Sequence, residues 1–203
     1  MKLIGMLDSP YVRRVAISAK CLGIPLEHQS VSVFRHFEQF QQINPVVKAP
    51  TLVLDDGEVL MDSTLIIDYL ESLSSPGNSL LPTALPQRLR ALRLIGLALA
   101  ACEKSVQIYY ERNLRPSEKQ HAPWLDRVSG QLHAAYSALE QELARQPLPM
   151  DGTLQQDGIT LAVAWSFTLL VVPDQVDVAQ FPLISAFTAY AEQQPAFVET
   201  PMS

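Results

Sequence analysis

The sequence contains little cysteine, little glycine and little charge. Its 203 residues include 2 cysteines, Cys21 and Cys102, which are too few and too far apart for a disulfide framework or a zinc site. Its 8 glycines form no glycine-rich phosphate loop. Charged residues make up 18% of the chain and the formal net charge is -6, so the chain is a poor general binder of nucleic-acid phosphates, although a local basic patch stays possible. We therefore expect no metal and no nucleic-acid partner.

A long hydrophobic run is also missing. The most apolar stretch, 91–101, has about half the length of a membrane span and contains Arg93. The apolar run at the N-terminus is too short for a signal peptide and is followed by Asp8. We therefore expect no membrane partner, and a soluble protein of the cytoplasm.

Apolar residues make up 48% of the chain, which suffices for a core, and 15 prolines punctuate it. Before residue 80, strand and helix patterns alternate. The expected strands are 2–6, 26–33, 51–54 and 59–61. Helices are expected to begin at residues 10 and 63, and 35–43 is expected to be a short, irregular helix or a loop. A right-handed crossover makes the first two strands parallel, whereas a turn at 55–58 makes the last two an antiparallel hairpin. The order βαβ-α-ββα indicates a small mixed sheet with helices on its faces.

The rest of the chain shows helix patterns alone. A segment rich in proline, serine and glycine joins the two parts. The helices expected after it are 86–115, 124–145, 161–172 and 182–194. Pro173 and Pro195 are expected to close the last two. We divide the chain into an α/β domain at 1–76, a linker at 77–87 and an all-α domain at 88–203.

This architecture resembles that of the glutathione transferases, in which a thioredoxin-like α/β domain precedes an all-α helical bundle, and the resemblance covers essentially the whole chain. Ser9-Pro10-Tyr11-Val12 stands where the related glutaredoxins have Cys-Pro-Tyr-Cys. Both thiol positions are lost, so disulfide exchange at this turn is excluded. The resemblance implies that the Ser9 hydroxyl donates a hydrogen bond to the glutathione sulfur and stabilises its thiolate. The residues alone also fit a simple helix N-cap.

The segment Asn44–Val53 is similar to the family motif Asn-Pro-x-Gly-Lys-Val-Pro-x-Leu. The resemblance implies a cis peptide bond before Pro50 and a backbone contact from Ala49 to the cysteinyl part of glutathione. It also implies a contact from Lys48 to the glycyl carboxylate, although Lys48 equally fits a solvated surface lysine. The chain departs from the motif at Val47, where glycine is usual, and at Ala49, where valine is usual.

The segment Met61–Leu70 resembles the family motif Glu/Asp-Ser-x-x-Ile-x-x-Tyr-Leu. The resemblance implies that the backbone N–H and hydroxyl of Ser63 hold the γ-glutamyl carboxylate while Asp62 faces its ammonium. An Asp-Ser pair is also an ordinary helix cap. Three motifs in the family order and spacing favour the glutathione site.

The segment Asp157–Ala162 resembles the family's helix-start motif, in which a Ser or Thr N-cap is followed three residues later by Asp. Val163 stands at that later position. We therefore expect Thr160 to cap a helix without the reciprocal hydrogen bond.

Further residues stand where the family lines its site. Arg35 is expected near the glycyl carboxylate. The second-substrate pocket is expected to include Tyr11, Tyr109, Tyr110 and Trp165, although aromatic residues on helices more often belong to a core.

The resemblance implies a bacterial, serine-type glutathione transferase that uses reduced glutathione as co-substrate and no metal. It further implies a homodimer and attack of the thiolate on a small apolar electrophile, as in detoxification. Two alternatives stay open. One is a non-catalytic interaction module of the same fold, as in the stringent starvation protein. The other is a glutathione-dependent isomerase or dehalogenase, which would share every glutathione contact.

Overall fold

The computed structural model describes residues 1–75 and 77–202, and the chain forms two compact units. One unit consists of Met1–Leu80 with Gln193–Ser203, and the other of Leu81–Glu192. The sequence predicts domains at 1–76 and 88–203 around a linker at 77–87. The boundary between the two units, after Leu80, falls within that linker, and the end of the chain joins the first unit. Residues 76 and 203, which bound the two expected domains, lie outside the described residues.

The first unit is built on four strands in the order β2-β1-β3-β4. β1 (Lys2–Ile4) runs parallel to β2 (Glu27–Gln29) and antiparallel to β3 (Thr51–Val53). β3 pairs antiparallel with β4 (Val59–Met61). The expected parallel first pair and antiparallel hairpin are confirmed, although β2 is much shorter than the segment 26–33.

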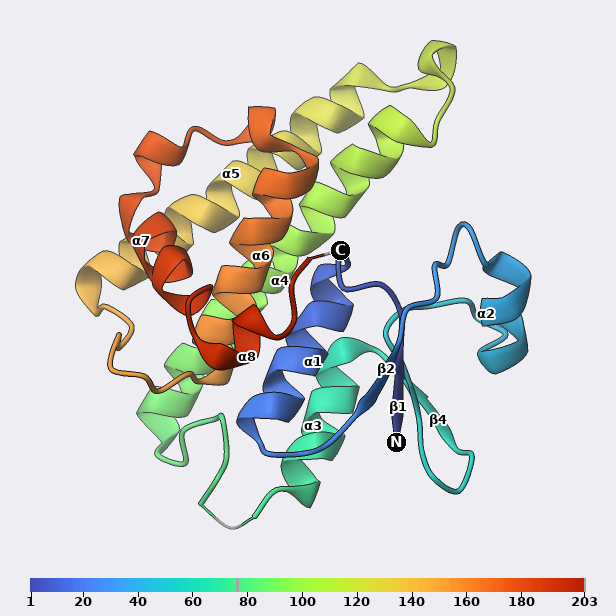
Figure 1. The fold of residues 1–203 in the computed structure, drawn as a ribbon. Coiled ribbons are helices and arrows are strands. Elements are labelled where there is room, and N and C mark those ends of the chain that lie inside the picture. Colours follow the sequence, from blue (N-terminus) through green and yellow to red (C-terminus); the bar gives the residue numbers. More distant parts are fainter. Residues whose placement is uncertain (76, 203) are drawn as a thin grey trace. The chain divides into compact units, whose positions relative to one another are not determined.

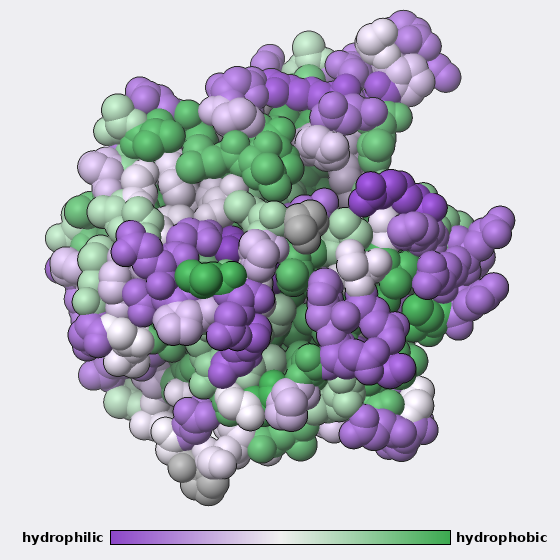
Figure 2. Space-filling view, in the orientation of Figure 1, coloured by the Kyte–Doolittle hydropathy of each residue, from purple (hydrophilic) through white to green (hydrophobic). Residues whose placement is uncertain are grey.

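Helices cover both faces of this sheet. α1 (Pro10–Cys21) and α3 (Ser63–Leu73) lie together on one face, and α2 (Phe37–Ile43) lies on the other (Figure 1). Phe40 is fully buried in a small apolar core beneath α2. The glutamate and glutamines of α2 face solvent, so hydrophilic side chains dominate this part of the surface (Figure 2, right).

The C-terminal segment closes the first unit beside α1. It contains the short helix α8 (Pro195–Val198). The Arg13 guanidinium lies 5.3 Å from the centre of the Phe197 ring, and its Nε donates to the Thr200 carbonyl at 2.8 Å. These contacts with α1 explain why the end of the chain belongs to the first unit. No local sequence pattern predicts them.

The second unit is helical. Its long helices are α4 (Leu85–Asn113), α5 (Ala122–Arg145), α6 (Gln156–Val171) and α7 (Pro182–Ala191). α6 packs against α4 and α7 and is buried on all sides over its first three turns, as expected for a helix that is apolar all round. The expected all-α architecture is confirmed. In the described part of the chain, no helix has the length and apolar character needed to cross a membrane.

Two helix boundaries differ from the expectation by more than two residues. α6 begins at Gln156, so Thr160 lies inside the helix, and its hydroxyl donates to the Gln156 carbonyl at 2.7 Å. The prediction that Thr160 is the N-cap is therefore wrong. α7 ends at Ala191, and Pro195 begins α8 instead of closing a helix. Proline suits the first turn of a helix because the N–H that it lacks has no partner there.

Candidate functional site

Ser9 lies at the start of α1, shortly after β1. It is the N-cap residue, with Pro10 in the first turn, as predicted. Its side chain makes no capping hydrogen bond within the described chain, and the residue is half-buried. The hydroxyl therefore does not cap the N–H groups of the helix. The partial positive charge of the helix N-terminus lies beside it. An anion placed here would meet a hydroxyl donor and a favourable dipole.

Gly5 lets the loops of this region approach one another closely. Its φ angle is +141°, and a Cβ atom there would lie 2.6 Å from Cγ2 of Val12 and 3.2 Å from Cβ of Ala49. Glycine is therefore required at this position. The Ala49–Pro50 peptide bond is cis, as predicted. The end of β1, the first turn of α1 and the cis-proline loop thus meet at one place.

A side-chain network shapes the loop before β3. Asn44 Nδ2 donates to Thr51 Oγ1 at 2.9 Å, and Thr51 Oγ1 donates to the Lys48 carbonyl at 2.8 Å. Asn44 Oδ1 accepts a hydrogen bond from the Val46 N–H at 3.0 Å. In the middle of this loop Val47 has a φ of 52°. The loop thus holds a β-branched residue in the left-handed region, where the family motif has glycine.

The start of α3 provides a second set of polar groups. Asp62 is the N-cap residue and its Oδ1 accepts from the Thr64 N–H at 2.9 Å, so the predicted cap is confirmed. Ser63 is the first helical residue and is buried. Hydroxyl and amide donors at a helix N-terminus suit a carboxylate, and the carboxylate of Asp62 suits an ammonium.

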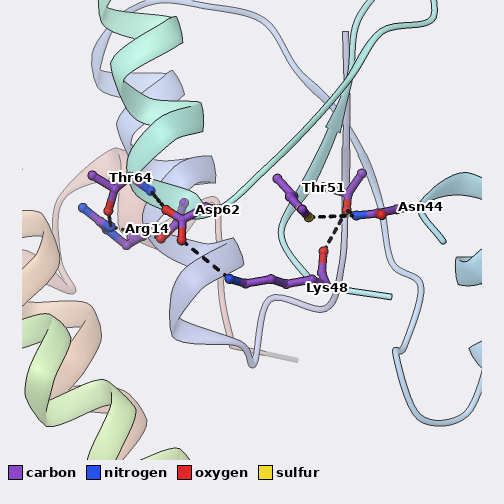
Figure 3. Close-up of polar contacts among 8 residues, drawn as sticks. Arg14, Asn44, Lys48, Thr51, Asp62 and Thr64 are labelled. Carbon is purple, nitrogen blue, oxygen red and sulfur yellow. Dashed lines mark hydrogen bonds and ion pairs between the residues drawn. The ribbon is translucent and has the colours of Figure 1, made fainter. Parts of the chain in front are cut away.

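Lys48 and Asp62 point toward each other (Figure 3). Lys48 Nζ lies 3.7 Å from Asp62 Oδ2, and the two side chains are 55% and 44% exposed. The structure therefore brings together residues from two of the three motifs. Arg35 is exposed, and its Nη2 lies 3.9 Å from Met6 Sδ in the loop that leads to Ser9.

Sequence reasoning missed Arg14. Its side chain is buried, and its Nη1 donates to Ser63 Oγ at 3.0 Å and to Thr64 Oγ1 at 3.1 Å (Figure 3). The signal was present, because Arg13 and Arg14 interrupt the apolar pattern of α1. A charge at such a position faces either solvent or a buried partner, and the packing of the fold decides which.

The geometry of the first unit agrees with a known family. The family model for the glutathione S-transferase N-terminal domain matches residues 3–78. The uncharacterized GST-like protein YibF of Escherichia coli is 30% identical over 162 residues, which cover 80% of this chain and 76% of YibF. The chain belongs to the glutathione S-transferase family.

Solved structures of glutathione S-transferases share the fold over the full chain. A family member from Pseudomonas fluorescens Pf-5, determined with bound glutathione, is 30% identical with a TM-score of 0.86, and the match covers 100% of this chain and 98% of that one. A glutathione S-transferase from Methylobacterium radiotolerans, in complex with glutathione sulfonate, is 25% identical with a TM-score of 0.89 and coverage of 100% and 95%. The thioredoxin-like first unit and the helical second unit are those of a glutathione S-transferase.

Trp165 is predicted for the second-substrate pocket, with a place in the helical core as the alternative. It is buried in α6, and its ring meets the rings of Tyr136 and Phe181 edge-on at centroid distances of 4.8 and 5.5 Å. Its burial places it in the core of the helical unit and favours that alternative.

The other predicted pocket residues are more accessible. Tyr11 is half-buried in the first turn of α1. Tyr110 is 41% exposed and lines an open hollow of about 510 Å³ with Leu114 and Trp124, at the end of α4. The Tyr109 ring lies 6.3 Å from the Tyr110 ring. The hollow is mixed in character, because Gln107, Glu111, Arg115 and Lys119 also line it, and Tyr110 is the one predicted pocket residue among its lining residues.

Proposed function

We propose that the chain binds reduced glutathione along the first unit, in the cytoplasm, and uses its thiolate to attack a small apolar electrophile. The observation that carries the proposal is the cluster at the start of α3, where Asp62 pairs with Lys48 and the next residue, Ser63, begins the helix. The similar Pseudomonas and Methylobacterium proteins were determined with glutathione and glutathione sulfonate bound, which supports the same ligand class here.

The charges of the cluster complement those of the tripeptide, which carries one ammonium and two carboxylates. In the proposed complex, the Ser63 amide and hydroxyl hold the γ-glutamyl carboxylate and Asp62 holds the ammonium. Lys48 meets the glycyl carboxylate, with Arg35 on the same side, and the Ala49 backbone beside cis-Pro50 holds the cysteinyl part. Lys48 and Asp62 pair with each other in the ligand-free structure, and glutathione offers each a new partner.

Ser9 is the proposed catalytic residue. Its hydroxyl would donate to the glutathione sulfur, and the N-terminus of α1 would favour the thiolate. The sulfur then forms a bond to the electrophilic carbon, and the displaced electron pair leaves with the leaving group or takes up a proton from water. Thiolate stabilisation and positioning suffice for this step, so no general base is needed.

Calorimetric titration with reduced glutathione tests the binding site. We expect saturable binding by the wild type, weakened about tenfold or more by Asp62→Ala and by Ser63→Ala, because each removes a hydrogen bond to a charged group. Asp68→Ala is the matched control, since Asp68 is an exposed carboxylate further along α3, and it should leave the affinity unchanged. If the wild type does not bind glutathione at millimolar concentration, the proposal is wrong.

Turnover of an activated aryl halide and an α,β-unsaturated carbonyl tests the enzymatic part. Ser9→Ala should retain glutathione binding and lose most of the rate. A wild type that binds glutathione but converts no electrophile would instead favour the non-catalytic module. An isomerase or dehalogenase would share all the glutathione contacts and differ in the substrate that is turned over.

A homodimer is the second part of the proposal. Leu85, Leu89 and Leu92 recur at helical spacing on one face of α4 and are 77%, 68% and 48% exposed. A row of exposed leucines of this kind is typical of a protein–protein interface.

A further inference from the structure

Arg14 is a charged residue in the interior of the first unit. Only 2% of its surface is exposed, and it projects from α1 toward the start of α3. Removing a guanidinium from water is unfavourable unless its N–H groups find good partners. Its Nη1 donates to the hydroxyls of Ser63 and Thr64 at 3.0 and 3.1 Å (Figure 3). Arg14 therefore contacts the first two residues of α3 from beneath.

The direction of these hydrogen bonds decides what the hydroxyls offer to a ligand. A guanidinium donates and never accepts, so both hydroxyl oxygens act as acceptors toward Arg14. Each hydroxyl then keeps its own proton to donate elsewhere. A hydroxyl that accepts from a cation is also a stronger donor, because hydrogen bonds in a chain polarise one another. The start of α3 thus presents a polarised hydroxyl donor, a helix dipole and a buried positive charge.

We propose that Arg14 is a positioning residue for the γ-glutamyl carboxylate of the ligand. It holds the Ser63 hydroxyl as a donor toward that carboxylate and places a positive charge beneath the helix N-terminus. The inference rests on the proposed function, since it assigns Arg14 to the γ-glutamyl end of the same glutathione site. Recognition of the γ-glutamyl carboxylate should therefore depend on Arg14.

Arg13 provides a matched control. It is the adjacent residue of α1 and equally buried, with 1% of its surface exposed. Its Nε donates to the Thr200 carbonyl and its guanidinium lies over the Phe197 ring, so these contacts are with the C-terminal segment. Loss of either arginine removes a buried charge from α1, whereas loss of Arg14 alone disturbs the start of α3.

The experiment measures the binding of two ligands to the wild type, to Arg14→Met and to Arg13→Met by calorimetry. The ligands are reduced glutathione and 4-aminobutanoyl-cysteinyl-glycine, which keeps the amine and thiol but lacks the γ-glutamyl carboxylate. The measured quantity is the dissociation constant of the analogue divided by that of glutathione. This ratio reports how strongly the protein recognises the γ-glutamyl carboxylate. We expect Arg14→Met to lower the ratio about tenfold by weakening glutathione binding while leaving the analogue's affinity nearly unchanged. Arg13→Met should lower the melting temperature and leave the ratio as in the wild type.

A purely structural role makes the opposite prediction. If Arg14→Met weakens both ligands by the same factor, or leaves both affinities unchanged, the inference is overturned. If Arg14→Met does not fold, Arg14→Gln decides, because it keeps a donor without the charge. A lower ratio for Arg14→Gln supports the inference, and an unchanged ratio overturns it. If the wild type binds neither ligand, the proposed function fails, and this inference fails with it.

Discussion

Val47 and Asp62 have φ angles of 52° and 77°, although neither is a glycine. Both flank the proposed glutathione site. The left-handed region costs an L-residue about 1–2 kcal/mol, and it is most unusual for a β-branched side chain. Local hydrogen bonds oppose this cost, because the Val47 N–H donates to the Asn44 carbonyl at 2.9 Å and Asp62 Oδ1 accepts from the Thr64 N–H. The strained backbone therefore lies where the ligand is proposed to bind.

The strain at Val47 predicts an inverted order of stability for two small substitutions. Val47→Gly should be more stable than Val47→Ala by about 1 kcal/mol, since both lose the side chain but only glycine is relaxed at positive φ. Val46 is the control, because it is 61% exposed and not in the left-handed region. There glycine should be less stable than alanine by about 0.5–1 kcal/mol. Urea unfolding measures all four variants, and alanine being favoured at both positions would contradict the strain argument.

The Lys48–Asp62 ion pair predicts how the site distinguishes ligands. Lys48→Met should weaken glutathione binding about two- to fivefold, the range expected for an exposed ion pair with the glycyl carboxylate. It should not weaken binding of the C-terminal amide of glutathione, in which a neutral carboxamide replaces the glycyl carboxylate and which gains access to an unpaired Asp62. Calorimetry with both ligands at low salt tests this. An equal loss for the two ligands would show that Lys48 does not contact the glycyl end.

At the scale of the element, α6 approaches α7 closely at one glycine, Gly158. A Cβ atom at Gly158 would lie 2.7 Å from Cζ of the buried Phe187 ring of α7. Gly158→Ala should therefore destabilise the protein by about 1–3 kcal/mol, although alanine is the better helix former. Gly130 in α5 is exposed and has open space around it, so Gly130→Ala should instead stabilise by up to about 1 kcal/mol. Thermal unfolding of both variants measures the sign, and destabilisation by both would contradict the packing argument.

Two helix boundaries and the buried Arg14 could not be predicted from the sequence. The strand and helix order could be predicted because it depends on local patterns, and cis-Pro50 could be predicted from the resemblance of Asn44–Val53 to the family motif. Thr160 could not be placed, since threonine either caps a helix or bonds back to a carbonyl one turn earlier inside it. Pro195 was ambiguous because proline follows one helix and begins another. The contacts of Arg14 depend on how α1 packs against α3, which no local pattern contains.

At the scale of the whole molecule, both chain ends belong to the unit with the proposed glutathione contacts. The N-terminal amine pairs with Asp55 at 2.6 Å, and Lys20 of α1 pairs with Glu199 of the C-terminal segment at 2.6 Å. The helical unit, Leu81–Glu192, supplies none of the glutathione contacts proposed here. Its tasks in the proposed function are therefore the second substrate and the contact with a second copy of the chain.

The leucine row on α4 predicts the oligomeric state. The wild type should elute with twice the mass of the chain in size-exclusion chromatography with light scattering. Leu89→Glu should weaken the dimer roughly a hundredfold, because it would bury an unpaired carboxylate in an apolar contact. Leu170→Glu is the matched control, since Leu170 in α6 is also exposed, at 52%, and lies outside the row, so it should leave the dimer intact. A monomeric wild type at micromolar concentration, or an unchanged dimer in Leu89→Glu, would assign the row to another role. Glutathione affinity should survive the loss of the dimer, because every proposed contact with the tripeptide comes from the first unit of one chain.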